Sequence, residues 1–349
     1  MSTAPHRAGR RTAWLPVLGL ILLSPVCAEY LIGYDTTIGD PVALLAGLVI
    51  LGPLYGAPAV LLREVARRLG GGWPTVLLLA CAAGLIQAGL IDQSLFSLTF
   101  SAEDPAWAQA QGATPIPGTG VDADQLLSFV GGHVIWSFAA PIAVVEALSG
   151  PRRSEPWLGP GGLALLVPAY LVAAAVVHDG EAEGAAPAQL VATALLVIGL
   201  GTAAVGWARR SLRRSRSATP DPRQGPAPLT VLLATGGLLL ATQLASGVGA
   251  WIGVAVVAAA LVALGTLLAR WSRRRSWGPP HVLAVAGAAL LVRAGLSFQV
   301  EPLGVVDPAM KLFANGAMLT LSVLLLVLAA RRLSSPPGRE EPSSGTGPG

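Results

Sequence analysis

Ten apolar segments divide the chain, and they constrain its fold more than any other feature. A membrane-spanning helix needs about 20 predominantly apolar residues to cross about 30 Å of hydrocarbon. Charged residues make up only 12% of the 349 residues, against about 25% in a soluble domain. The sequence therefore predicts an all-α polytopic transmembrane helix bundle of about ten spans. The segments cover residues 13–33, 41–62, 74–98, 125–149, 161–178, 187–207, 227–246, 248–271, 280–298 and 306–330.

The basic residues alternate with these segments. If the N-terminus is cytoplasmic, all of the 23 Lys and Arg residues except Arg293 and Lys311 fall on the cytoplasmic side. The opposite loops carry acids and contain neither Lys nor Arg. Because short cytoplasmic loops are enriched in Lys and Arg, both termini are predicted to be cytoplasmic. The dominance of Arg over Lys, with much Ala and Gly, is typical of a GC-rich bacterial genome, so we expect a multi-pass protein of the bacterial cytoplasmic membrane.

Two segment boundaries leave alternatives. The basic start followed by an apolar run also fits a signal peptide cleaved before Glu29, but apolar residues continue through Ile32, which favours a retained first helix. Only Gln243, Ser246, Gly247 and Gly249 separate the seventh and eighth segments. Fusing these two would make one span far longer than a bilayer requires.

Helix breakers divide the chain into unequal parts. Prolines interrupt the spans of residues 1–207, whereas the spans of residues 227–330 are uninterrupted Leu/Val/Ala helices. Broken helices are tolerated where protein or a water-filled cavity satisfies the freed backbone groups. We therefore expect a six-span first part that carries the polar site, a basic cytoplasmic loop at 208–226, a four-span scaffold at 227–330 and a disordered cytoplasmic tail at 331–349.

Five titratable side chains on five spans are predicted to lie at one level, in the outer third of the membrane. A charge inside a span costs about 2.5–3.5 kcal/mol on insertion scales, so such groups usually pair or line a wet cavity. The alternative is that the long side chains reach separately for the lipid headgroups. With Ser137, one turn deeper than His133, the candidate site residues are Glu29, Asp92, His133, Ser137, Arg293 and Lys311.

Helical spacing turns one of these groups toward a partner helix. Ala80, Gly84, Ala88 and Asp92 recur every four residues, and small residues let helices approach closely. Asp92 is then placed to hydrogen-bond His133 and to fix its tautomer. A Ser–His–Asp hydrolase is conceivable from these groups, although no Gly-x-Ser-x-Gly turn accompanies them.

Other charged groups have structural interpretations. Glu64 and Arg68 have the i,i+4 spacing of a local ion pair, and Glu146 is expected within reach of loop arginines such as Arg152.

The acidic loop 99–124, which contains Trp107, is either a lid over the site or disordered. There is no phosphate-binding glycine loop and no metal-ligand motif, so we expect no cofactor and no ATP-driven transport. The basic balance comes from short loops and does not indicate nucleic-acid binding.

Several stretches of the first 160 residues resemble a group of uncharacterised polytopic membrane proteins of actinobacteria. They are SPVCAEYLIG, PLYGAPAVLLREVARRLGGGWPTVLLL, GLIQAGLIDQSLF, GHVIWSFAAPIAVVEAL and PWLG. A fainter similarity is to the CAAX-type prenyl protease and bacteriocin-processing family, whose spans carry a paired Glu motif and later His residues. The corresponding place here, Gln87–Ala88, has no carboxylate pair, and His133 matches a single family His. This departure removes the catalytic base, so protease activity is not expected from the resemblance.

Three functional hypotheses remain from the sequence. The first is a non-ATP-driven transporter or permease for a small polar solute, with Asp92 and His133 as a responsive pair. The second is a membrane-embedded hydrolase that acts on lipid or peptide. The third is a non-catalytic assembly or sensor protein whose charges only hold helices together. The expected partner is the lipid bilayer, together with a small polar solute or a lipid at the polar site.

Overall fold

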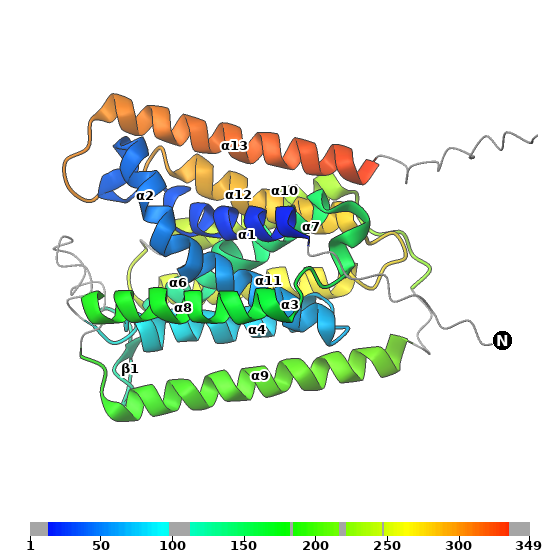
Figure 1. Ribbon diagram of the computed structural model, residues 1–349, viewed down its shortest axis with the longest axis horizontal. Coiled ribbons are helices and arrows are strands. Elements are labelled where there is room, and N and C mark those ends of the chain that lie inside the picture. Colours follow the sequence, from blue (N-terminus) through cyan, green and yellow to red (C-terminus); the bar gives the residue numbers. More distant parts are fainter. Residues whose placement is uncertain (1–12, 98–111, 182–183, 216–220, 246–247, 335–349) are drawn as a thin grey trace, which may run out of the picture.

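Long helices that run along one common direction make up the protein (Figure 1). The computed structural model describes residues 13–97, 112–181, 184–215, 221–245 and 248–334. The longer helices are α1 (Trp14–Pro25), α2 (Pro41–Leu51), α3 (Ala57–Arg68), α4 (Trp73–Ile86), α6 (Ala123–Gly132), α7 (Ala140–Leu148), α8 (Pro160–Glu181), α9 (Pro187–Ser215), α10 (Pro228–Ala245), α11 (Trp251–Trp271), α12 (Pro279–Leu296) and α13 (Pro308–Ser334). The prediction of an all-α bundle is confirmed.

Short segments complete the secondary structure of the described ranges. Four of them are π-helical: η1 (Val26–Tyr30), η3 (Gly52–Gly56), η4 (Gln87–Ile91) and η5 (His133–Ala139). The 3₁₀ turns are η2 (Thr36–Gly39) and η6 (Gly150–Ser154), and one antiparallel hairpin pairs β1 (Pro115–Ile116) with β2 (Val121–Asp122).

The helical runs match the predicted spans. Nine runs within the described residues are long and apolar enough to cross a membrane, and a shorter apolar run covers Trp14–Tyr30. The two closely spaced segments form separate helices, α10 and α11, with a left-handed backbone conformation at Ala250 (φ 52°) between them. The first apolar segment is packed into the bundle, since Val17, Leu20 and Cys27 are fully buried.

The two ends of the bundle differ in charge. At the end where η1, η4, α8, α10 and α12 finish, the loops contain no Lys or Arg and carry the acids; we call this the acidic end. The opposite end carries the arginines that close α3, α11 and α13, and we call it the arginine end. Helix α1 begins and α13 ends at this same end (Figure 1). The charge alternation predicted from the sequence is therefore built into the arrangement of the helices.

The π segments interrupt or end the first four helical runs: η3 and η5 lie inside a run, and η1 and η4 end one. In each, a backbone N–H reaches the carbonyl five residues back, as Leu31 does to Val26 (2.8 Å) and Asp92 to Gln87 (3.1 Å). All four lie in the part of the chain where prolines predicted helix breaks. Because π turns inside α-helices occur frequently at functional sites, these segments indicate where a functional site would lie.

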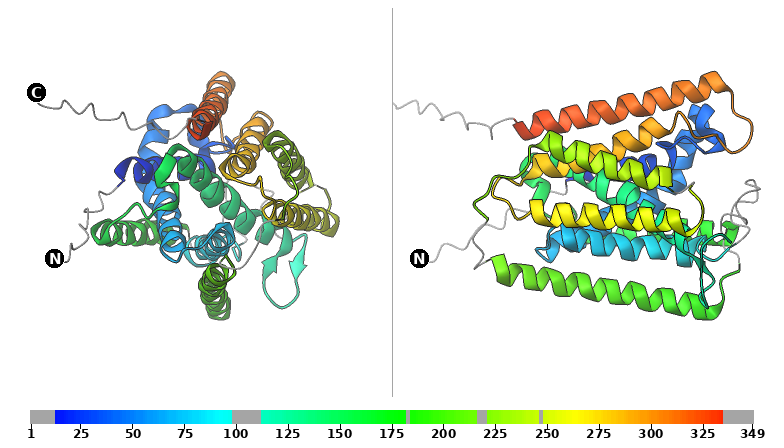
Figure 2. Two further views of the ribbon diagram at one scale, coloured as in Figure 1. Left: turned by 90° about the vertical axis from the view of Figure 1, so that its right-hand side faces the viewer. Right: turned by 180° about the vertical axis from the view of Figure 1, so that it is seen from behind.

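The run α6–η5–α7 lies in the middle of the bundle (Figure 2) and contacts α1, α4, α12 and α13. Its side chains Phe138, Ile142 and Val144 are fully buried in the main hydrophobic core. Helices α8 and α9 lie at the periphery, and only 11% of each apolar window is buried. Side chains on η5 are therefore held in the centre, whereas α8 and α9 present apolar surface of the kind that faces lipid.

Two of the predicted loops contain regular structure. The segment 208–226 was expected to be a loop, but residues 208–215 continue α9, where Leu212 packs against Gly70. Farther along, the Asp221 carboxylate pairs with Arg274 at 3.0 Å. Of the expected lid, residues 112–122 form the hairpin, and Asp122 caps the N-terminus of α6. Residues 331–334, predicted as the start of the tail, continue α13, which ends at Ser334. Outside the described residues lie 98–111 with Trp107, the remaining loop residues 216–220, and the tail from 335.

Candidate functional site

Glu29 is one of the residues of the candidate site and lies near the acidic end. It lies in η1, and its Oε2 accepts a hydrogen bond of 2.6 Å from the Tyr34 hydroxyl. Tyr34 lies in the loop that follows the helix, and the nearby Glu29 carboxylate raises the pKa of its phenol well above the ordinary value. The phenol therefore stays protonated and remains a donor to Glu29.

Arg293 approaches from α12, near the other end of the chain. Its guanidinium lies 4.6 Å from the centroid of the Trp136 ring, and Nη1 donates to Gln243 Oε1 at 3.2 Å. Nε is buried and has no hydrogen-bond partner among the residues that the structure describes. The Arg293 charge interacts electrostatically with Glu29. These contacts turn Arg293 into the bundle, in contrast to the alternative in which it reaches for headgroups.

Tyr55 contacts both His133 and Glu29, which the sequence did not place together. It lies in η3, and its ring stacks on His133 with centroids 5.8 Å apart and planes at 29°. Its hydroxyl also interacts electrostatically with Glu29 and Asp92. The sequence prediction missed Tyr55, although a tyrosine between Pro53 and Gly56 inside an apolar run is a recognisable signal, because a buried phenol usually needs a polar partner.

His133 and Ser137 form the centre of the site on η5. His133 Nδ1 lies 3.1 Å from Ser137 Oγ, and the two residues are 9% and 2% exposed, so both are shielded from solvent. Ser24 donates from its hydroxyl to the Tyr55 carbonyl (3.1 Å) and also contacts the Ser137 carbonyl. Gln87 donates to the Leu54 carbonyl at 2.8 Å. Polar side chains thus bind carbonyls of the π segments, which the bilayer core could not solvate.

The Asp92 carboxylate binds the backbone of the turn that follows η4. Its Oδ1 accepts a hydrogen bond from the Ser94 backbone N–H at 2.9 Å, while His133 uses Nδ1 on Ser137. The expected Asp92–His133 hydrogen bond is thus not among the contacts of these described residues. The small-residue face itself is confirmed, because a Cβ added at Gly84 would lie 3.2 Å from His133 Cβ.

Lys311 lies beside the site and contacts it through the backbone. Its Nζ and the Asn315 amide both donate to the Ser297 carbonyl, at 3.2 and 2.9 Å. The Ser297 N–H in turn donates to the Arg293 carbonyl at 3.1 Å. The structure therefore brings Glu29, Arg293, Tyr55 and His133 together, and Lys311 contacts the chain at Ser297, one helical turn after Arg293.

A second polar cluster lies at the arginine end and is more deeply buried. The Arg63 side chain is fully buried; its Nε donates to Glu146 and its Nη1 to Glu64, both at 3.0 Å. Arg67 donates to both carboxylate oxygens of Glu146, at 2.8 and 2.6 Å. The predicted Glu64–Arg68 pair is present at 3.3 Å. The expectation that Glu146 meets Arg152 is wrong, because the partners come from α3.

This cluster also fixes the loop that follows α7. Arg63 donates to the carbonyls of Arg153 and Glu155 at 2.7 and 2.6 Å, and Glu64 accepts from the Trp157 N–H at 2.6 Å. The Arg63 guanidinium lies 3.6 Å from the centroid of the Trp157 ring. Since every charge here has a partner, the cluster fits a structural role, as the sequence suggested for Glu64 and Glu146.

The chemistry available at the acidic end is the binding of polar groups. Within the described ranges, no three His, Cys, Asp or Glu side chains gather as metal ligands. Glu29, His133 and the tyrosine hydroxyls can form hydrogen bonds with a polar group, and the Arg293 guanidinium keeps an unused donor.

The fold and the buried charges define a polytopic α-helical membrane protein. Its family follows from comparison: residues 18–335 match the model of an "Uncharacterized membrane protein family", and the chain belongs to that family. No curated protein and no solved structure matches the chain.

Proposed function

We propose that the protein is a permease of the bacterial cytoplasmic membrane that moves a small polar solute, or protons with it, without ATP. The cluster of Glu29, Tyr55, His133 and Arg293 is its solute site. An ionisable group inside a membrane is costly and by default indicates a functional site. By the positive-inside rule, the arginine end faces the cytoplasm and the site lies toward the outer face.

One observation carries the proposal. Three of the four site residues lie on π segments, η1, η3 and η5, and they come from three different helical runs. The fourth, Arg293, interacts with Glu29 while one of its own donors has no partner. A group that only locked the helices together would be expected to have a partner for each of its nitrogens, as Arg63 has at the other end. The unpaired N–H of Arg293 beside the Glu29 carboxylate is suited to bind a polar solute.

The proposal is tested by access to the site from the two sides of the membrane. Ser137→Cys is made in a background in which both native cysteines, Cys27 and Cys81, are alanine. We expect a membrane-impermeant maleimide to label it from either side of sealed vesicles, because alternating access exposes a central site to both faces. Ala204→Cys, fully buried in α9, is the control and should remain unlabelled. Labelling from one side only, or from neither, would overturn the proposal.

A hydrolase is the second candidate, favoured by the 3.1 Å distance between His133 Nδ1 and Ser137 Oγ. Both residues lie on one helical segment, and Asp92 is not hydrogen-bonded to His133 as a triad acid would be. We therefore expect a fluorophosphonate probe to leave the protein unmodified, as judged by intact mass. Modification that disappears in Ser137→Ala would instead establish a serine nucleophile.

A further inference from the structure

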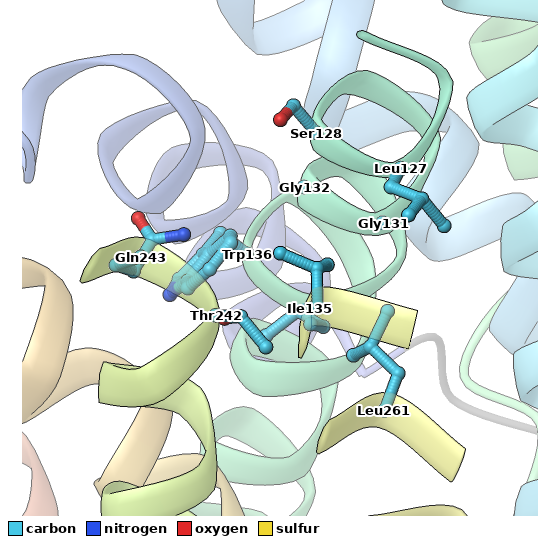
Figure 3. Close-up of a pocket in the computed structure, with 10 residues that line it drawn as sticks. Leu127, Ser128, Gly131, Gly132, Ile135, Trp136, Thr242, Gln243 and Leu261 are labelled. Carbon is cyan, nitrogen blue, oxygen red and sulfur yellow. The ribbon is translucent and has the colours of Figure 1, made fainter. Parts of the chain in front are cut away.

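A narrow cleft opens between α6–η5, α10 and α11 (Figure 3). Ser128 at its rim is exposed, and so is the neighbouring Val256 of α11. The cleft therefore opens on the outer surface of the bundle, which the bilayer covers. It lies outside the polar site but borders it. Trp136 lines the cleft, and the Arg293 guanidinium lies over the Trp136 ring.

Two glycines shape the cleft, and helix packing does not explain them. A Cβ added at Gly131 would meet no described atom within 4 Å, and one added at Gly132 would only touch the Trp136 ring at 4.0 Å. Gly84, in contrast, is required by a close helix contact. At Gly131 and Gly132 the missing side chains leave space open toward the bilayer, where a leucine would otherwise fill it.

The cleft has the length of one lipid leaflet. Gln243 lies two residues before the end of α10, and Leu261 lies ten residues into α11. At 1.5 Å per residue the cleft runs from about 3 Å to about 15 Å below the acidic end of these helices. Half of a hydrocarbon core is about 15 Å, so a single alkyl chain along the cleft would reach the middle of the membrane.

A polar group stands at the upper end of the cleft. The Oε1 atom of Gln243 accepts a hydrogen bond from Arg293. Figure 3 shows the amide nitrogen of Gln243 on the side of Trp136. The Arg293 guanidinium lies behind this amide and donates to its oxygen at 3.2 Å. At this end of the molecule Arg293 and Lys311 are the only Lys or Arg residues in the sequence, so an amide N–H backed by a guanidinium is a local feature of this end. A phosphate oxygen is the acceptor that such a donor favours.

We propose that this cleft is a binding site for one outer-leaflet phospholipid, with an acyl chain along Gly131 and Gly132 and the phosphate near Gln243. The lower wall, which includes Leu261, is apolar and suits the chain. The proposal does not depend on transport, because it concerns the lipid-facing side of Trp136.

The test uses the full-length protein in nanodiscs that contain a phosphatidylglycerol with a diazirine in its acyl chain. We expect the crosslink to map to α6 and α11, and to be competed by unlabelled phosphatidylglycerol but not by diacylglycerol, which lacks the phosphate. Gly131→Leu should lower crosslinking by roughly tenfold. Gly199→Leu is the matched control, since Gly199 of α9 also faces open space, and it should leave crosslinking unchanged.

A second variant separates loss of the site from loss of the fold. Gln243→Leu removes the phosphate donor while it keeps the chain volume, so crosslinking should fall and competition by diacylglycerol should rise to the level of phosphatidylglycerol. Equal crosslinking of the Gly131→Leu and Gly199→Leu proteins would overturn the proposal. So would equal competition by both lipids in the unmodified protein.

Discussion

Glu146→Gln lowers the free energy of unfolding by about 3–5 kcal/mol, the cost of removing one partner from a buried ion pair. The carboxylate of Glu146 accepts from Arg63 and twice from Arg67. An amide of the same shape offers one acceptor and two donors, so at least one N–H of the substituted side chain faces an arginine N–H. Arg63, whose side chain is fully buried, then keeps a charge that only Glu64 compensates.

The measurement is the unfolding free energy in lipid bilayers, obtained by steric trapping with the protein reconstituted at pH 7. Glu155→Gln is the matched control because Glu155 is an exposed carboxylate in the same region and gives the cluster only its backbone carbonyl. It should change stability by no more than about 0.5 kcal/mol. Equal losses in the two variants would show that the cluster does not hold the arginine end together.

A double-variant cycle sharpens the attribution. If Glu146 stabilises the fold mainly through Arg67, then Arg67→Gln should cost much less in the Glu146→Gln background than alone. The coupling is expected at about 1–3 kcal/mol, the range for residues in one buried network. Additive losses would assign the effect of Glu146→Gln to Arg63 instead.

The sequence predicts the fold class well because the bilayer reduces the choices. Only helices and closed barrels satisfy the backbone in hydrocarbon, so ten apolar segments give ten helices without any knowledge of packing. Even the weak boundary at Gln243 to Gly249 separates α10 from α11. What each helix contacts is not encoded in span length, which is why Glu146 was assigned to Arg152 and not to the arginines of α3.

The sequence identifies several side chains of the candidate site but not their contacts, and η4 gives a physical reason for one of these. The stripe Ala80, Gly84, Ala88 and Asp92 assumes a regular helix, but η4 inserts its wider turn before Asp92. One extra residue rotates everything after it by about 100°. Gly84, before the insertion, packs on His133 as expected. Asp92, after it, hydrogen-bonds the Ser94 backbone instead.

The same π segments explain why Tyr55 was missed. Its role depends on η3 lying beside η1 and η5, an arrangement between helical runs that no spacing in the sequence reveals. Glu29, His133 and Arg293 could be identified because a charge in an apolar run stands out, whereas a tyrosine does not. Polar groups with large apolar bodies are therefore the ones that sequence reasoning at membrane sites overlooks.

Gly56→Ala is expected to be the most damaging of the single-methyl additions, because it pushes α1 away from η3. A Cβ at Gly56 would lie 2.5 Å from the Ile21 carbonyl oxygen and 2.8 Å from the carbonyl carbon, and closer still to Ile21 Cα. These are backbone atoms, so no side-chain rotation relieves the overlap. Overpacking of this kind costs about 1–3 kcal/mol and occasionally more.

The displacement also reaches the proposed solute site. Tyr55 precedes Gly56 in η3, and Glu29 follows Ile21 by two helical turns, so separating the two runs pulls Tyr55 from Glu29 and His133. We expect Gly56→Ala to lower the thermal unfolding temperature in detergent, and to abolish two-sided labelling of Ser137→Cys at temperatures where the protein remains folded. Gly199→Ala is the control: its added methyl meets open space, and the better helix propensity of alanine adds up to about 1 kcal/mol. If Gly56→Ala unfolds no earlier than Gly199→Ala and labels like the parent, the close contact between α1 and η3 does not position the site.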